Sequence, residues 1–355
     1  MLLPVSDPLF HATSNGAFTP CWRAVVSAQM CGVEMRNLVS KSRINLTMKF
    51  YCAKVVLLPI ILMSPLYASA ADQLRPFELA FNTSGNVAWV ATQIEQKLVA
   101  NGFEVVGTYV PYTNLKFSNG ETVSAEVIGV TNAALKQAAA QTEFGGYAVV
   151  QRVTITKVND QIQVAYTNPI YMANAYRLKN DMAGVEEQLA KALGANEAYG
   201  SRNGLSASSL HNYHYKMMMP YFADLDTLAE YSSYQKALDA VNAGLTVHKG
   251  GTSKVYQVAV SGKDQTLFGV ALSGFAGNEC GGDAHIMGII DANNPKSTGY
   301  MPYSILVSGG TVYALPAKFR IAVDFPDLSM MGPNGFMKIR CAPGSIEKAL
   351  KDASN

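Results

Sequence analysis

Two histidines and three methionines stand close together in the stretch from Leu210 to Phe222, which also holds three tyrosines. His211 and His214 are three residues apart, and this spacing puts two side chains on one face of a helix. Met217 and Met218 could join them, and imidazole and thioether ligands together suit copper. One hypothesis is therefore a metal or haem site formed by His211, His214, Met217 and Met218.

The same stretch also reads as a strand, because alternate residues of a strand face opposite sides. One face would be mostly apolar and would hold His211, Tyr213, Tyr215, Met217, Met219 and Tyr221. The other face would be mixed, and the two histidines would be separated. This alternation favours a half-buried strand, because methionine and aromatic residues at core spacing are usually core.

Tyrosine joins an apolar ring to a polar tip and often lines ligand grooves. The sequence has 18 tyrosines, several of them in short runs. We therefore consider His214, Tyr213, Tyr215 and Tyr166 as candidate ligand-binding residues. His214 is the most informative of them if it faces a groove between two halves of the chain.

Cys280, Asp283 and His285 offer a thiol, a carboxylate and an imidazole within six residues. A Cys280–His285 pair would suit a hydrolase or redox enzyme if the imidazole held the thiolate. The alternative is a disulfide from Cys280 to Cys341, which would remove the nucleophile. It would tie the glycine-rich segment 274–283 to a final strand and close a loop of about sixty residues, a constraint of around 4 kcal/mol.

We expect the disulfide, because the other three cysteines lie in or before a leader that resembles a secretory signal. A basic segment, Met48–Lys54, precedes an apolar run, Val55–Leu66, and Tyr67-Ala-Ser-Ala70 follows as a cleavage site. The apolar run contains two prolines and is too short to span about 30 Å of hydrocarbon as a helix. The chain is thus predicted to be periplasmic or secreted, with no membrane span after cleavage at residue 70.

Residues 1–47 show no sustained helix or strand period ahead of this leader. We interpret them as a non-structural extension from a misassigned translation start, with Met48 as the true start. A genuine long extension is the alternative. N-terminal sequencing of the exported protein should begin near Ala71.

Charge and motifs exclude several functions. From Ala71 onward 22 Lys and Arg stand against 24 Asp and Glu, and no basic stripe is present. Nucleic-acid binding through phosphate neutralisation is therefore not expected. A phosphate-binding Gly-Lys-Ser/Thr loop, a zinc His-Glu-x-x-His motif and a Gly-x-Ser-x-Gly elbow are all lacking. We assign no catalytic residue and no cofactor, and expect a protein that is not an enzyme.

Patterning divides the mature chain into two similar parts, 71–200 and 210–355, joined by a linker over 201–209. Each part reads as strand, helix, two strands, an irregular or helical piece, a hairpin and a helix. In the second part we expect the first strand at His211–Phe222, a helix at Leu225–Ala243 and a hairpin whose second strand is Val312–Val323. A repeated order of this kind predicts an α+β fold of two tandem antiparallel-sheet-plus-helix units.

The first part resembles the domain of unknown function 302 family. The resemblance rests on the helix ending Asn101-Gly102-Phe103-Glu104-Val105 and on the hairpin strand ending Val164-Ala-Tyr-Thr-Asn-Pro169. It covers about 100 residues, and the second part resembles a divergent copy in which Asp324–Asp327 matches the break at Thr167–Pro169. The resemblance implies an antiparallel sheet with helices on one face and carries over no functional residue. The duplication and the insertion Gly274–Thr298 depart from the single-domain pattern.

These observations predict an exported, non-catalytic binding or assembly protein. Its partner would be a small apolar or aromatic ligand, or another protein. A periplasmic metal or haem binder that uses His211–Met219 is the first alternative, and a Cys/His-dependent enzyme is the second.

Overall fold

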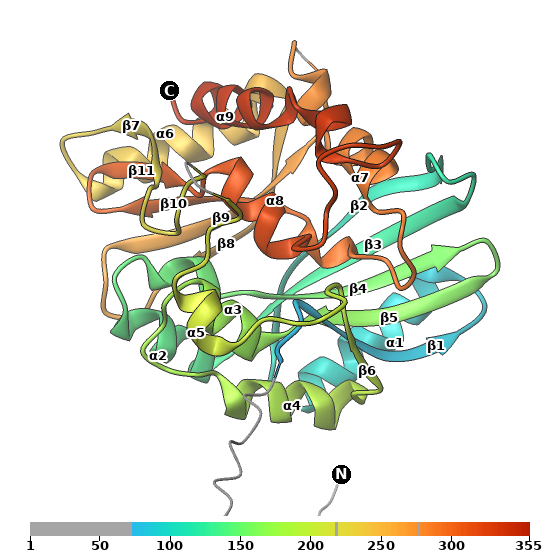
Figure 1. The fold of residues 1–355 in the computed structure, drawn as a ribbon. Coiled ribbons are helices and arrows are strands. Elements are labelled where there is room, and N and C mark those ends of the chain that lie inside the picture. Colours follow the sequence, from blue (N-terminus) through green and yellow to red (C-terminus); the bar gives the residue numbers. More distant parts are fainter. Residues whose placement is uncertain (1–72, 217–218, 276) are drawn as a thin grey trace, which may run out of the picture. The chain divides into compact units, whose positions relative to one another are not determined.

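The computed structural model describes residues 73–216, 219–275 and 277–355, which belong to one compact unit built on two antiparallel sheets. The first sheet has the strand order β2-β3-β4-β5-β1-β6. The second has the order β7-β11-β10-β9-β8. The predicted α+β class with two sheet-plus-helix units is confirmed (Figure 1).

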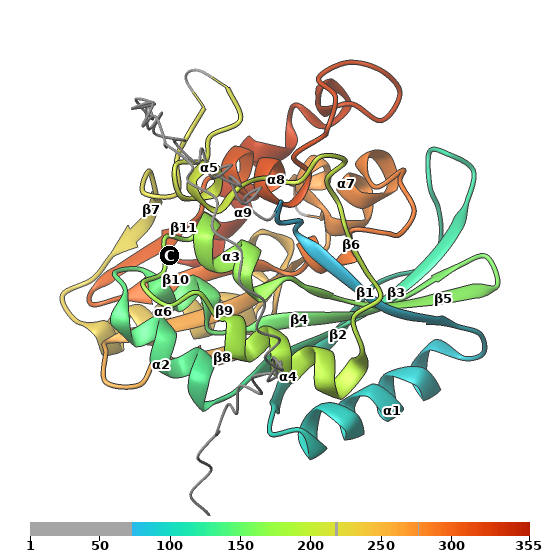
Figure 2. The same cartoon turned by 60° about the horizontal axis from the view of Figure 1, so that its bottom comes forward.

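The first half runs from β1 to β6. Its elements are β1 (Phe77–Thr83), α1 (Val87–Ala100), β2 (Glu104–Lys116), β3 (Thr122–Thr131), α2 (Ala133–Gln141), η1 (Gly145–Ala148), β4 (Gln151–Val158), β5 (Gln161–Thr167), α3 (Pro169–Ala175), α4 (Ala183–Leu193) and β6 (Glu197–Tyr199). Helices α1 and α4 pack on one face of the first sheet, as Figure 2 shows.

The second half follows after the short helix α5 (Ala207–His211). Its elements are β7 (Asp226–Glu230), α6 (Tyr234–Thr246), η2 (Lys249–Gly251), β8 (Thr252–Ala259), β9 (Gln265–Leu272), η3 (Glu279–Gly281), α7 (Asp283–Ile290), η4 (Thr298–Tyr300), β10 (Tyr303–Ser308), β11 (Thr311–Ala314), α8 (Ala317–Asp324), η5 (Phe336–Ile339) and α9 (Ala342–Ala353). Helices α6 and α9 pack together beside the second sheet, at the top of Figure 1.

The two halves share one order of principal elements: strand, helix, two strands, helix, two strands and two helices. The strand order of the second sheet also matches that of the first when β7 to β11 replace β1 to β5. Even a β-bulge recurs, at Val106 in β2 and at Val255 in β8. After each bulge the next residue pairs with a glycine, Gly129 or Gly269.

Local sequence explains several of these elements. The side chains of Asn86, Asn132 and Asn168 accept hydrogen bonds from backbone N–H groups of the first turns of α1, α2 and α3, as N-caps do. The predicted hairpins form across Asn159-Asp160 and Gly309-Gly310. Asn159 and Gly309 have φ values of 53° and 56°, a backbone conformation that asparagine and glycine tolerate.

Each half also covers the inner face of the other half's sheet. Gly146 in η1 lies against Leu306 of β10, where an added Cβ would be 2.5 Å from the leucine Cδ1. Gly299 in η4 lies against Phe77 of β1, where an added Cβ would be 2.9 Å from the ring. Both glycines precede a buried tyrosine, and both sit just before the fourth strand of their half. The hydrophobic core is therefore built jointly by the two halves.

Three element predictions for the second half are wrong. His211 ends α5, the described residues that follow to Phe222 form no strand, and the first strand is β7. The expected helix Leu225–Ala243 is β7 followed by α6. The expected strand Val312–Val323 ends at Ala314, and α8 takes up its second part.

The proline break was also assigned to the wrong residues. Pro169 starts α3 directly after β5, and the residue in the same position after β11 is Pro316, which is the N-cap of α8. Asp324–Asp327 instead lies at the end of α8. The glycine-rich insertion likewise contains helix α7, the counterpart of α2.

Candidate ligand-binding site

An apolar groove lies between α8 and the stretch that connects the two halves. Its cavity volume is about 270 Å³. The lining residues are Tyr215, Lys216, Met219, Lys318, Ile321, Ala322, Phe325, Leu328, Met330 and Phe336. Apart from two lysines and one tyrosine, these side chains are apolar, so the groove suits a small apolar body.

Two tyrosines of the connecting stretch hold it against the second half. The hydroxyl of Tyr213 donates to the carbonyl of Ala322 at 2.9 Å, and the hydroxyl of Tyr215 donates to the carbonyl of Leu328 at 3.0 Å. Arg177 links the stretch to the first half instead, because its Nε donates to the carbonyl of His211 at 2.8 Å. Both tyrosine hydroxyls are thus used in building the groove wall, which leaves their rings for apolar contact.

The positive charge of the groove comes from Lys216 and Lys318. Both side chains are exposed, and the Lys216 ammonium lies 5.4 Å from the centroid of the Tyr215 ring. Among residues 73–355 as described, neither ammonium forms an ion pair with a carboxylate. An anionic group at the edge of the groove would therefore meet two uncompensated positive charges.

Helix α8 carries the lining residues Lys318, Ile321 and Ala322. A buried arginine of the same helix, Arg320, anchors it to the segment before β10. This side chain is 1% exposed, and its guanidinium donates to the carbonyls of Tyr300 and Pro302 and stacks 4.9 Å from the Tyr303 ring centroid. Asp324 lies 3.7 Å from Arg320 and is fully buried. Burial raises the pKa of the Asp324 carboxyl, while the guanidiniums of Arg152 and Arg320 oppose this shift.

A second, larger cavity is a polar cleft of about 680 Å³ between the two halves. The first half contributes Arg75 and the segment 197–202, and the second half contributes residues from 290–297 and 325–335. The cleft and the apolar groove share Phe325 and Leu328 as lining residues. Neither cavity is lined by His214.

The predicted ligand-binding residues are not all brought together. Tyr215 lines the groove, and Tyr213 supports its wall. His214 contacts Tyr221 at 4.6 Å between ring centroids, and its Nδ1 lies 3.0 Å from the carbonyl of Lys216. Tyr166 is 1% exposed in β5, and its hydroxyl donates to the carbonyl of Gly194 at 3.3 Å.

The metal hypothesis stays a prediction, because Met217 and Met218 lie outside the described residues. His211 is the last residue of α5, and His214 lies in the turn that follows. In the part of the chain that the structure describes, no three His, Cys, Asp or Glu residues are grouped so that they could hold a metal ion.

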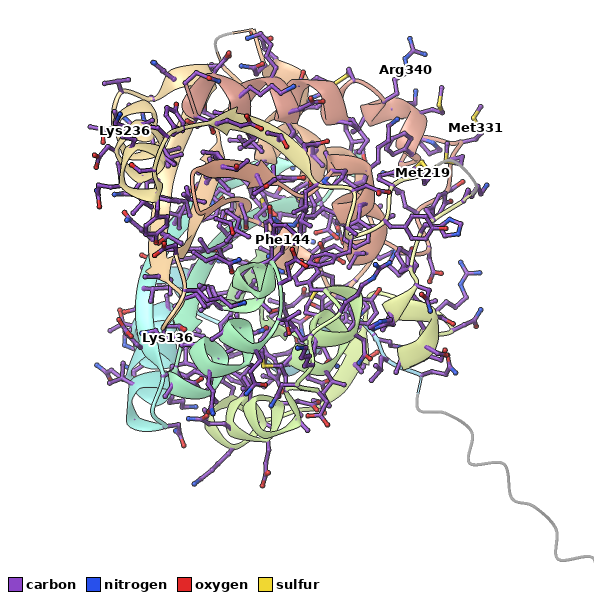
Figure 3. The ribbon with its side chains drawn as sticks, turned by 90° about the vertical axis from the view of Figure 1, so that its left-hand side faces the viewer. Lys136, Phe144, Met219, Lys236, Met331 and Arg340 are labelled. Atoms are coloured by element: carbon purple, nitrogen blue, oxygen red, sulfur yellow. A yellow bond between two sulfur atoms is a disulfide. The ribbon has the colours of Figure 1, made fainter. Side chains whose placement is uncertain are left out.

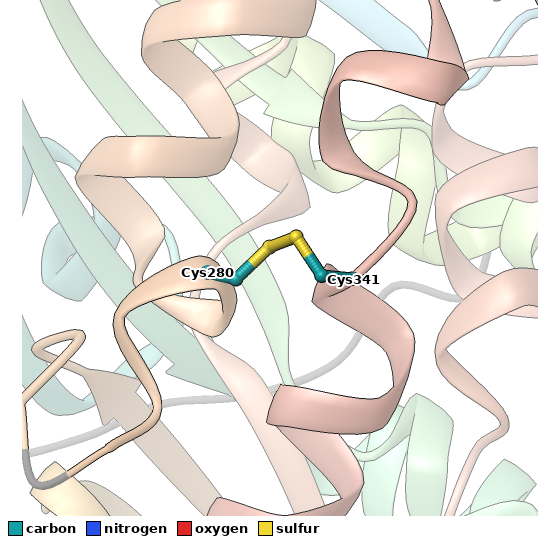
Figure 4. Close-up of a disulfide and its surroundings, with 2 residues drawn as sticks. All are labelled: Cys280 and Cys341. Carbon is teal, nitrogen blue, oxygen red and sulfur yellow. A yellow bond between two sulfur atoms is a disulfide. The ribbon is translucent and has the colours of Figure 1, made fainter.

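The predicted disulfide between Cys280 and Cys341 is present (Figure 4). It closes a loop of 61 residues and joins η3 to the start of α9, not to a strand. With its sulfur bonded, Cys280 offers no thiol to His285, which is exposed on α7. The Cys–His pair therefore lacks its nucleophile.

Sequence patterning missed Lys318, Phe325 and Phe336. All three lie more than 100 residues beyond Tyr215, and α8, which positions the first two, was read as a strand and a break. Figure 3 shows Met219 and Met331 at one margin of the molecule and Lys236 at the opposite side. The helical spacing of Lys318, Ile321, Ala322 and Phe325 is the sequence pattern that could have identified α8 and this wall of the groove.

With this geometry in view, the chain can be placed among known proteins. The family described as Domain of unknown function DUF302 matches residues 79–196, from β1 to the end of α4. The predicted resemblance of the first half to this family is therefore confirmed. No curated protein and no solved structure matches the chain. Among the helices described here, none has the length and apolar character that a membrane span needs.

Proposed function

We propose that this chain is an exported, non-catalytic binding protein whose apolar groove takes a small molecule with an apolar body and an anionic end. The observation that carries the proposal is the pairing of an apolar lining with the unpaired ammonium groups of Lys216 and Lys318. The disulfide supports export, because such bonds persist in oxidising compartments. The predicted leader ending at Ala70 also supports export to the periplasm or medium.

We also infer that the two halves arose by duplication of one α+β unit. Three features support this inference: the shared element order, the matching strand order and the recurrent bulge at Val106 and Val255. The groove lies outside residues 79–196, which match the family. It is formed by the connecting stretch, by α8 and by the segment after α8. All its lining residues lie between Tyr215 and Phe336, in the connecting stretch and the second half.

Titration calorimetry with decanoate and with decanol tests the proposal. The two probes share an apolar chain and differ in charge at one end. We expect decanoate to bind more tightly, since each exposed ion pair contributes ~0.2–1 kcal/mol. The double variant Lys216→Gln/Lys318→Gln should remove this preference and leave decanol binding unchanged.

Lys236→Gln is the matched control, because Lys236 is an exposed lysine on the distant helix α6 that pairs with no carboxylate in the described part of the chain. It should retain the full preference for decanoate. The variant Ala322→Phe should fill the groove and abolish binding of both probes, with folding checked by thermal unfolding. Equal binding of decanoate by the wild type and the double lysine variant, or no binding of either probe, would overturn the proposal.

A further inference from the structure

The polar cleft between the halves has properties that differ from those of the apolar groove. Its volume of about 680 Å³ lies within the usual range of small-molecule sites, which is roughly 300–1,000 Å³. Its walls come from both halves, with Tyr199 and Arg202 on one side and Asn293 and Asn334 on the other. The cleft therefore exists only because the two halves are joined.

Hydrogen bonds between separate segments of the chain hold residues of the cleft wall in place. Arg75 Nε donates to the carbonyl of Ser201 at 2.8 Å, and the Tyr199 hydroxyl donates to the carbonyl of Lys296 at 2.8 Å. The Asn294 side-chain oxygen accepts a hydrogen bond from Gln163 Nε2. A wall fixed before the ligand arrives loses little conformational entropy on binding.

The charges of the cleft are balanced. Arg75 and Arg202 supply two guanidiniums, and Glu197 and Asp327 supply two carboxylates. The Arg202 backbone N–H donates to the Asp327 carboxylate, while its exposed guanidinium and the exposed Glu197 carboxylate form no ion pair among the described residues. An anionic ligand would face both carboxylates and a cationic ligand both guanidiniums, so the balance favours a ligand without net charge.

The remaining polar groups point to a ligand rich in hydroxyls. Among the described residues, the Asn293 amide, the Arg202 guanidinium and the Glu197 carboxylate have no hydrogen-bond partner, so both donors and acceptors face the cleft. The Asn334 amide and the Ser201 and Ser329 hydroxyls instead form hydrogen bonds within the protein. A hydroxyl both donates and accepts, and it can satisfy either kind of group. Tyr199 and Phe325 also line the cleft, but they are only 6% and 7% exposed and their rings pack against Phe77 and Tyr300.

We propose that the polar cleft, which adjoins the apolar groove at Phe325 and Leu328, is a second binding site for a short neutral saccharide. The exposed side chains of Arg202, Glu197 and Asn293 bind its hydroxyls. The site requires both halves of the chain.

The test uses the full folded chain and three neutral trisaccharides: maltotriose, cellotriose and chitotriose. Titration calorimetry should show binding of at least one of them. Arg202→Ala and Asn293→Ala should each weaken that binding about three- to tenfold, the effect of losing one or two net hydrogen bonds. Arg340→Ala is the matched control, since Arg340 is an exposed arginine that lines neither cavity (Figure 3).

Several outcomes would overturn the proposal: no binding by any of the three trisaccharides, binding unaffected by Arg202→Ala, or tighter binding of the zwitterionic dipeptide Ala-Gln. The result is separable from that for the apolar groove. Lys216→Gln/Lys318→Gln should leave trisaccharide binding unchanged, and Arg202→Ala should leave decanoate binding unchanged.

Discussion

Tyr109 of β2 donates its hydroxyl to the carboxylate of Asp283 at 3.0 Å, so a strand of the first half reaches the first turn of α7 in the second. The same Asp283 oxygen accepts the backbone N–H of Leu272 at 2.9 Å. Burial raises the pKa of Asp283 from 3.8 to about 7, against the opposing effect of these two hydrogen bonds. The junction between the halves therefore contains a carboxyl group that titrates near neutrality.

This relationship predicts a pH dependence of stability. Because the pKa of Asp283 is higher in the folded protein, the folded state keeps a proton that the unfolded chain releases. The contribution of the protonated Asp283 carboxyl to the free energy of unfolding is full below pH ~4 and is lost as the pH rises to about 7. We expect the free energy of unfolding to fall by up to a few kcal/mol across this range, as measured by urea unfolding.

Asp283→Asn should reduce the dependence of the free energy of unfolding on pH between pH ~4 and pH ~7. Asp291 and Glu78 also have a pKa raised to about 7 by burial, so some slope remains in the variant. A wild-type stability that increases between pH 4 and pH 7 would contradict the assignment.

The disulfide is expected to contribute about 4 kcal/mol to stability, the value for a closed loop of 61 residues. The double variant Cys280→Ser/Cys341→Ser should lose this amount in denaturant unfolding under oxidising conditions. Adding a reductant should destabilise the wild type to the same level and leave the double variant unchanged. If both thiols are labelled by an alkylating reagent in the unfolded protein without reductant, the bond is absent.

Close contact between β2 and β8 predicts a strong effect of Gly107→Ala. A Cβ at Gly107 would overlap the carbonyl oxygen of Val255, and such overpacking typically costs ~1–3 kcal/mol. Gly184→Ala is the matched control, because a Cβ there meets no atom within 4 Å. The control should be neutral or slightly stabilising, since alanine is the better helix former. Equal thermal midpoints for the two variants would argue against the contact.

Asp324→Asn should destabilise the protein strongly. The substitution keeps the side-chain shape and removes the negative charge that faces buried Arg320 and Arg152. Losing one partner of a buried ion pair typically costs ~3–5 kcal/mol. Asp352→Asn, in the exposed pair with Lys348, should change stability by less than ~1 kcal/mol. Comparable losses in the two variants, measured by denaturant unfolding, would contradict this role of Asp324.

Much of the first half could be predicted from sequence because its signals are local. Asn132 caps α2, and the two-residue turn at Asn159 fixes the β4–β5 hairpin. The second half was harder, because alternating tyrosines and methionines after His211 imitate a strand while the stretch is held by side-chain bonds to distant carbonyls. Pro316 was overlooked as a helix start, although proline is common at that end of a helix.

The candidate site was less predictable than the fold. Tyr215 was identified, because tyrosine was expected in a groove. The opposite wall of the groove, however, comes from α8, Met330 and Phe336. No local sequence pattern indicates that these residues lie against the connecting stretch. The polar cleft depends in the same way on Arg75 and Asn334, which are distant in the chain and close only in the fold.

The reciprocal placement of Gly146 and Gly299 has a consequence for how the chain can be divided. Each half lacks the piece that seals the inner face of its own sheet, so neither half is expected to be a stable protein when expressed alone. Cutting the connecting stretch should leave two fragments that remain associated and that refold only as a pair. Because the halves are joined in one chain, their association is an intramolecular step rather than an encounter between two molecules, and assembly is independent of protein concentration.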